Sequence, residues 1–166
     1  MERLGHAGEF AARSDGSGSA LSIGNFDGLH LGHREVVGRC VARARALVVP
    51  AVVLTFEPHP LELLDPGRAP RRLTTPGIRA SLLADLGVDI LVEHPFTAEL
   101  AEKDPAEFID DVVLGLLRAR FVAVGSGFRF GKGRAGDGRL IERMASEAGF
   151  EASVVGDIAV DGEVVS

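Results

Sequence analysis

Short apolar runs alternate along the chain with stretches of helical spacing, and this order predicts the fold. The runs are rich in β-branched residues, which is typical of buried strands, while the other stretches repeat apolar residues every three to four positions. Strands that alternate with helices favour a single three-layer α/β domain with a mostly parallel sheet. The predicted strands are residues 19–26, 48–56, 88–93, 121–125 and 151–155, and the predicted helices are residues 34–47, 75–86, 104–117 and 140–148.

Local capping and turn signals support several of these boundaries. Thr75-Pro76 is typical of an N-cap with proline at the first helical position, and the helix that follows would turn Ile78 inward. The segment Asp104-Pro105-Ala106-Glu107 has the capping-box pattern that opens a helix. The pair Asp161-Gly162 is a hairpin-turn signal near the end of the sequence.

The first 18 residues have a different character from the rest of the chain. They are polar and rich in Gly and Ser near their end, and they predict a loosely ordered leader before a domain that spans residues 19–166. This leader lacks the apolar middle of a signal peptide, and no run in the chain approaches the roughly 20 apolar residues of a membrane helix. We therefore expect a protein that is neither exported nor bound to a membrane.

Composition narrows the class of protein further. The chain has 166 residues, of which 46% are hydrophobic and 25% charged, so it is long and apolar enough to form one core. Its formal net charge of −6 does not favour nucleic acid as a partner, so any anion site must be local. The single cysteine, Cys40, cannot form an intramolecular disulfide, which predicts a reducing, cytoplasmic compartment.

Three unusual loops follow predicted strands, after Ile23, Phe56 and Val124. Ligands of open α/β sheets bind outside the carboxyl ends of the strands, so we expect these loops to converge on one site. The chain contains neither a P-loop pattern nor G-x-G-x-x-G, which argues against a P-loop kinase and against an NAD enzyme.

The first loop reads Gly-Asn-Phe-Asp-Gly-Leu-His-Leu-Gly-His over residues 24–33. His30 and His33 are three residues apart at a predicted helix start, where free N–H groups and the helix dipole favour an anion such as phosphate. The alternative is that both rings merely cap the turn or pack on the core. A zinc site has little support, because His59 is the only further candidate ligand and no cysteine accompanies it.

The second loop is Thr-Phe-Glu-Pro-His-Pro over residues 55–60, in which two prolines stiffen the backbone around His59. Taken alone, such a hexapeptide is more often a rigid turn than a site. A further stretch, residues 65–79, carries four arginines among prolines and glycines. It is equally consistent with a mobile flap over an anionic substrate and with a solvated loop.

The third loop, residues 125–136, is rich in glycine and locally basic. Residues 125–139 contain four basic side chains and one acidic one, inside a chain that is acidic overall. Glycines let backbone amides face a phosphate, and we infer that Lys132 or Arg134 contacts one. Phe128 and Phe130 could pack on a ring system of a ligand, but we favour anchoring of the loop in the core.

Taken in order, these three loops resemble the FMN adenylyltransferase module of the prokaryotic bifunctional riboflavin kinase/FAD synthetases, in the H-x-G-H nucleotidyltransferase superfamily. The resemblance runs from about residue 19 to residue 166. It implies a Rossmann-like fold and the reaction of FMN with ATP, in the presence of Mg²⁺, to give FAD and pyrophosphate. The FMN phosphate, already an anion, would attack the α-phosphorus of ATP in line, so the enzyme's task is alignment and charge stabilisation.

The resemblance also implies roles for individual residues. His30 and His33 would contact the ATP phosphates and stabilise the transition state. Asp27 would brace the turn of the first loop, while His59 and Phe128 would lie toward the flavin. The nucleotide side would be lined by the first-loop residues Gly24, Asn25, Phe26, Asp27, Gly28 and Gly32.

Two departures from the family pattern bear on activity. Gly127 stands where the family usually has Asn or Asp, which removes a polar contact from the expected flavin or nucleotide site. The family also continues with a Ser-Ser-Thr-x-x-Arg segment that helps hold ATP, and Ser166 matches its first serine. These features imply a module without that segment and without the riboflavin kinase domain to which it is normally fused. The alternatives are a non-catalytic flavin- or nucleotide-binding module and another small H-x-G-H nucleotidyltransferase.

Overall fold

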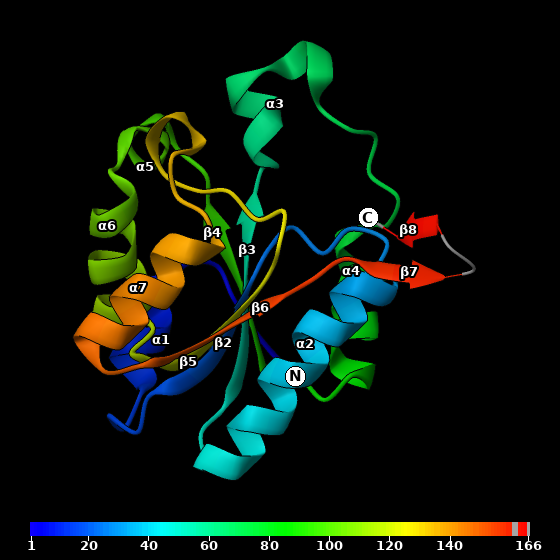
Figure 1. The fold of residues 1–166 in the computed structure, drawn as a ribbon. Helices are drawn as coiled ribbons and strands as arrows, with labels where there is room; N and C mark the ends of the chain where they lie inside the picture. The colour runs from blue at the N-terminus through cyan, green and yellow to red at the C-terminus, as the bar shows by residue number, and fades with distance from the viewer. Residues whose placement is uncertain (161–162, 166) are drawn as a thin grey trace.

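The computed structural model describes residues 1–160 and 163–165 and has a six-stranded sheet at its centre (Figure 1). All five strand pairs in this sheet are parallel, which confirms the predicted α/β class. A separate antiparallel pair, β7 (Ile158–Val160) and β8 (Glu163–Val165), follows it. The strand order is β1-β4-β3-β2-β5-β6, formed by Glu2–Leu4, Ile90–Pro95, Ala51–Glu57, Ser19–Ile23, Ala119–Gly125 and Glu151–Val155.

Helices cover both faces of the sheet and complete three layers (Figure 1). On one face lie α1 (Ala7–Arg13), α6 (Pro105–Phe108) with its continuation, the π-helix Ile109–Leu116, and α7 (Gly138–Ala148). On the other lie α2 (Leu31–Leu47) and α4 (Pro76–Asp85). The short helices α3 (Pro60–Leu64), η1 (Pro66–Arg68), α5 (Ala98–Glu102) and η3 (Lys132–Arg134) lie in the connections.

The core consists of two apolar clusters, one on each side of the sheet. Successive side chains of a strand point to opposite faces, so Val52 and Leu54 of β3 join the cluster under α1 and α6, while Val53 joins the cluster under α2. Both faces are therefore apolar, which explains the continuous hydrophobic runs in the sequence. Burial raises the pKa of Cys40, on α2, to about 12, so this thiol is a core residue.

The order of the strands places a switch point between β2 and β5. From β2 the chain builds the sheet outward through β3 and β4, and it then returns to add β5 on the opposite side of β2. Crossover connections leave in opposite directions from such a point, and they open a crevice at the carboxyl ends of the strands. The loops that follow β2 and β5 are the first and third loops of the sequence analysis, so the fold brings them together.

The prediction of a loosely ordered leader over residues 1–18 is wrong for most of its length. Glu2–Leu4 forms β1 at the edge of the sheet beside β4, and the following residues form α1. Leu4, Ala7 and Phe10 are buried in the core. Three residues make a strand signal too short to detect, and the strand is stabilised by its pairing with β4, about 90 positions away in the chain, and by the burial of Leu4.

The predicted helix N-caps agree with the structure, whereas some predicted strand ends and side-chain orientations differ from it. Thr75 caps α4 by accepting a hydrogen bond from the Ile78 N–H, and the capping box at Asp104 is present. Ile78, predicted to face inward, is 52% exposed, and β3 begins at Ala51 rather than at residue 48. Asp161-Gly162 lies outside the described residues, between β7 and β8. In the described part of the chain, no helix has the length and apolar character needed to cross a membrane.

Candidate active site

Two adjoining cavities lie at the carboxyl edge of the sheet. The larger has a volume of about 610 Å³ and is lined mainly by aromatic and aliphatic side chains from the second and third loops, α3, α5 and α6. The smaller, of about 320 Å³, lies between the start of α2 and the end of β5. Four residues line both cavities and so mark the junction between them: Gly24, Asn25, Gly127 and Phe128.

The smaller cavity contains the histidine pair at the start of α2. The rings of His30 and His33 stack with a centroid distance of 3.6 Å, and the ring of His33 meets that of Phe26 edge-on. The Nδ1 atoms of both histidines are buried and have no hydrogen-bond partner among the described residues. Burial and the neighbouring His30 ring lower the pKa of His33 to about 4, so His33 is neutral near pH 7.

Backbone features at the start of α2 also favour an anion, in addition to the two histidine rings. Its N-cap, His30, makes no capping hydrogen bond with its side chain, and the first turn contains no acidic residue. The N–H groups of Leu31, Gly32 and His33 have no partner within the helix, and the helix dipole gives them positive character. Polar ring nitrogens, free backbone N–H groups and a first turn without acidic residues together fit a phosphate group.

The backbone of the first loop is held in an unusual conformation. Phe26 and Leu29 have positive φ angles of 49° and 39°, and both side chains are buried. Gly28 also has a positive φ, of 72°, and a Cβ there would lie 2.9 Å from Leu73. The backbone of a non-glycine residue is strained in this region of φ. The packing of the Phe26 and Leu29 side chains therefore holds the loop in a conformation that the local backbone energy disfavours.

Asp27 connects the first loop to the segment before α4, instead of facing either cavity. Its carboxylate accepts hydrogen bonds from the N–H groups of Leu73 and Thr74 and from the Thr74 hydroxyl, at 2.7–2.8 Å. Burial acts to raise the pKa of Asp27, but these hydrogen bonds together lower it below its ordinary value. The brace predicted for Asp27 therefore acts between two segments that are 46 residues apart.

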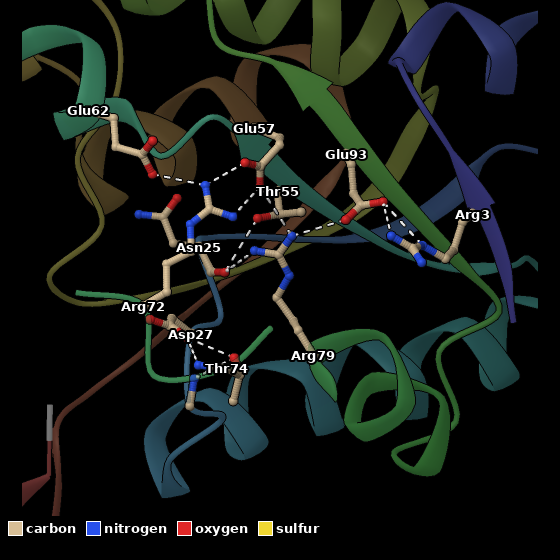
Figure 2. A network of polar contacts seen from close by, with 11 residues as sticks. Arg3, Asn25, Asp27, Thr55, Glu57, Glu62, Arg72, Thr74, Arg79 and Glu93 are labelled. Atoms are coloured by element: carbon tan, nitrogen blue, oxygen red, sulfur yellow. Dashed lines mark hydrogen bonds and ion pairs between the residues drawn. The ribbon is translucent and has the colours of Figure 1, made fainter. Parts of the chain in front are cut away.

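A buried arginine, Arg79, supports the first and second loops from beneath (Figure 2). Its Nη2 donates to Glu93 at 3.1 Å and lies 3.7 Å from Glu57, which follows β3's buried run. Its Nη1 lies 3.5 Å from the main-chain carbonyl of Asn25. Glu57 in turn accepts from Arg72, so two arginines of the stretch 65–79 form ion pairs with the second loop.

Arg79 and its partners were missed as site residues in the sequence. In the sequence, residues 65–79 show four arginines among prolines and glycines, which is consistent both with a flap and with a solvated loop. One signal was available: Arg79 lies four residues before Leu83, so both lie on the same face of α4, and that face is buried. Its partner Glu93 lies on β4, and no local sequence pattern connects a residue of this strand with Arg79.

The second loop presents His59 to the larger cavity and to Asn25. The Glu57–Pro58 peptide bond is cis, and His59 caps α3 by accepting a hydrogen bond from the Leu61 N–H. The other ring nitrogen, Nε2, lies 2.9 Å from the side-chain amide of Asn25. Burial lowers the pKa of His59 below its ordinary value.

The third loop carries the aromatic wall of the larger cavity. Phe130 is buried and stacks with Phe128 at a centroid distance of 5.4 Å, while Phe128 is half-buried and reaches both cavities. One ring thus anchors the loop in the core, as favoured from the sequence, and the other remains available to a ligand. Arg129 stabilises the turn by donating to the carbonyls of Ser126 and Phe128.

The two candidate phosphate contacts of this loop differ in their surroundings. Lys132 forms an ion pair with Glu102, with 2.7 Å between Nζ and Oε2, and it lines neither cavity. Arg134 lines the larger cavity and is exposed. Of the two, the geometry favours Arg134 as a contact for a bound anion.

The three loops predicted to converge do so. Most of the candidate residues chosen from the sequence line one or both cavities: Gly24, Asn25, Phe26, His30, Gly32, His33, His59, Gly127, Phe128 and Arg134. Asp27, Gly28 and Lys132 do not. Ser126 and Asp157, which were not singled out, share a hydrogen bond of 2.9 Å at the rim of the smaller cavity.

Comparison with known proteins adds three kinds of similarity. The family model described as FAD synthetase matches residues 12–166. The chain is 41% identical to the bifunctional riboflavin kinase/FMN adenylyltransferase of Escherichia coli K12, over 81% of this chain and 43% of that protein. It is 34% identical to the protein of the same name from Pseudomonas fluorescens, over 93% of this chain and 49% of that one. The chain thus spans just under half the length of these curated relatives.

A solved structure has the same fold. The crystal structure of a macrolide-efflux protein from Streptococcus pneumoniae superposes with a TM-score of 0.81, at 22% sequence identity. The superposition covers 99% of this chain and 54% of that chain. At this level of identity the match concerns the arrangement of helices and strands alone.

Proposed function

The chain belongs to the FAD synthetase family, and on that basis we propose that it is an FMN adenylyltransferase, which transfers AMP from ATP to FMN and releases pyrophosphate. The observation that carries this proposal is the pair of adjoining cavities. One is large and aromatic, the other is lined by two histidines at a helix start, and they share four residues. Two ligands that occupy them would meet at the junction.

The larger cavity fits the flavin. Its volume of about 610 Å³ lies within the usual range for a small-molecule site, and Phe56, Phe96 and Phe128 give it apolar, aromatic walls. Such walls suit a flat ring system, which binds by stacking and by burial of apolar area. Arg134, at the rim, could neutralise the FMN phosphate.

The smaller cavity fits the phosphates of ATP. An oxygen of the FMN phosphate would attack the α-phosphorus, a new P–O bond would form, and the bond to the bridging oxygen would break with its electron pair leaving on pyrophosphate. His30, His33 and the N–H groups of the first turn of α2 would donate to the phosphate oxygens where negative charge increases. Donors that are fixed before the reaction need no reorganisation during it, which is the main source of their catalytic effect.

Mg²⁺ would enter this reaction as part of the substrate MgATP. Among the described residues, no group of three or more His, Cys, Asp or Glu side chains is arranged to hold a metal ion. Mg²⁺ generally keeps several waters and binds through substrate phosphates with one or two carboxylates. Asp157, at the rim of the smaller cavity, is the carboxylate that could approach a hydrated ion there.

The decisive experiment is a chromatographic assay of the chain with MgATP and FMN, with riboflavin in a parallel reaction. FAD and pyrophosphate should increase together with time from FMN, and riboflavin should give no FMN. Tight binding of ATP or FMN without release of pyrophosphate would contradict the proposal and favour a binding module. Fusion to a riboflavin kinase domain, as in the relatives' names, and a cytoplasmic location stay predictions.

Substitution of Arg134 should separate flavin binding from chemistry. Because Arg134 lines the larger cavity, Arg134→Ala should raise the KM for FMN about fivefold to tenfold and leave kcat nearly unchanged. Lys132→Ala is the matched control, since Lys132 is in the same loop but pairs with Glu102. Steady-state kinetics with both variants check this prediction. Equal effects of the two substitutions, or no effect of Arg134→Ala, would contradict it.

A further inference from the structure

The side chain of His59 lies between two hydrogen-bonding groups. Its Nδ1 accepts a hydrogen bond from the Leu61 N–H at 3.1 Å, and its Nε2 lies 2.9 Å from Nδ2 of Asn25. A backbone N–H can only donate, so Nδ1 must carry a lone pair. A neutral imidazole has one N–H and one lone pair, and the proton of His59 is therefore on Nε2.

This tautomer determines which way the Asn25 amide must face. If Nε2 carries a proton and Nδ2 of Asn25 faces it, two N–H groups point at each other and neither has an acceptor. Rotation of the amide by half a turn places Oδ1 of Asn25 opposite the Nε2–H group and satisfies both. The NH₂ group of Asn25 then occupies the position on the other side.

We infer that His59 is a positioning residue, which donates from Nε2 to Oδ1 of Asn25 and so holds the Asn25 NH₂ group available to a phosphate oxygen at the junction of the two cavities. Asn25 lines both cavities, whereas His59 lines only the larger one. The ligand in this inference rests on the proposed function, but the hydrogen-bond orientation does not.

The negative charge of a phosphate group bound at the junction would make the orientation of the amide matter. A phosphate oxygen is a hydrogen-bond acceptor, so an amide carbonyl that faced it would repel it and an NH₂ group would bind it. A free asparagine side chain could present either group. A donor fixed at Nε2 of His59 selects one of them before the ligand arrives, which reduces the entropic cost of binding.

The orientation can be tested without any ligand, by NMR of the chain with ¹⁵N-labelled histidine. Long-range correlations between ring protons and nitrogens should show His59 with a proton on Nε2 and none on Nδ1. His94 is an internal reference, because its Nδ1 accepts from the Ala7 N–H at 3.1 Å and should give the same pattern. The His59→Asn variant assigns the signals by their loss. A proton on Nδ1 of His59 near pH 7 would overturn the inference.

The effect on binding can be tested with MgATP as the probe, by calorimetry. His59→Asn keeps an acceptor for the Leu61 N–H, as Asn is a good N-cap, but it is too short to reach Asn25. His59→Gln places an NH₂ donor near the position of Nε2. We expect His59→Asn to weaken MgATP binding about tenfold, which is the effect of about one hydrogen bond, and His59→Gln to change it by less than about threefold.

A double-mutant comparison separates positioning from a merely structural role. In an Asn25→Ala background, His59→Asn should have no further effect on the Kd for MgATP, because the group that it positions is absent. Equal losses for His59→Asn and His59→Gln, or a full loss in the Asn25→Ala background, would overturn the inference. Failure of the wild-type chain to form FAD while it binds MgATP would count against the proposed function alone. Failure to bind MgATP would overturn the phosphate contact together with the proposed function, and the NMR result would still decide the orientation.

Discussion

Alanine in place of His30 or His33 should lower kcat for FAD formation about 100-fold, comparable to the loss of one donor to an oxyanion. The two rings are stacked in the smaller cavity with buried Nδ1 atoms that have no partner among the described residues. Buried ring nitrogens without a partner in the protein are unusual, and a role in binding a ligand accounts for them. A contact that strengthens as charge moves onto pyrophosphate lowers the barrier rather than the KM.

The controls for this prediction separate catalysis from folding. His30 makes no capping hydrogen bond with its side chain, so His30→Ala should leave the unfolding midpoint nearly unchanged. His33 also packs on Phe26, and its variant needs an unfolding curve beside the kinetics. His6→Ala is the matched control, because His6 is a surface histidine outside both cavities. A folded His30→Ala variant with an unchanged kcat would contradict the role of the pair.

Gly131→Ala should reduce the free energy of unfolding by about 3 kcal/mol, through backbone strain and a steric clash. Gly131 has φ 73° and ψ 179°, a region that is essentially restricted to glycine. A Cβ there would lie 2.8 Å from the backbone of Pro105 at the start of α6, and backbone atoms cannot rotate away. The third loop would have to move off α6, and it carries Phe128 and Phe130, which line the larger cavity.

Gly133→Ala is the control, since Gly133 lies two residues away in the same loop. It also has a positive φ, of 62°, but its ψ of 16° is close to the left-handed helical region, and a Cβ there meets no atom within 4 Å. We expect a loss of only about 1 kcal/mol, which is the usual strain of a non-glycine residue in that region. Urea unfolding of both variants measures the difference. Equal losses would show that the contact with Pro105 does not hold the loop.

The sequence by itself determined the class of fold and the place of the site. Continuous apolar runs such as residues 51–54 are typical of a strand covered on both faces, so their alternation with helices sufficed to predict the parallel sheet. Capping groups act over three or four residues, which is why the starts of α4 and α6 were predicted correctly. The convergence of the three loops then followed from the geometry of parallel strands.

The tertiary structure decided which of the candidate side chains face the site. Lys132 and Arg134 belong to the same basic loop, yet Lys132 pairs with Glu102 and Arg134 lines the larger cavity. Asp27 lies in the first loop but binds residues 73 and 74. Local sequence carries no information about such partners, because they come from elements that only the folded chain brings together.

The same reason explains the N-terminal strand and the buried arginine. β1 is too short to be recognised by its own pattern, and it exists because its backbone groups pair with β4. Arginine is a residue type that usually lies on the surface, but Glu93 and Glu57 compensate the charge of Arg79 inside the protein. Hydrophobic periodicity and caps are local properties of the chain, whereas strand pairing and charge compensation are long-range properties, and only the folded structure determines them.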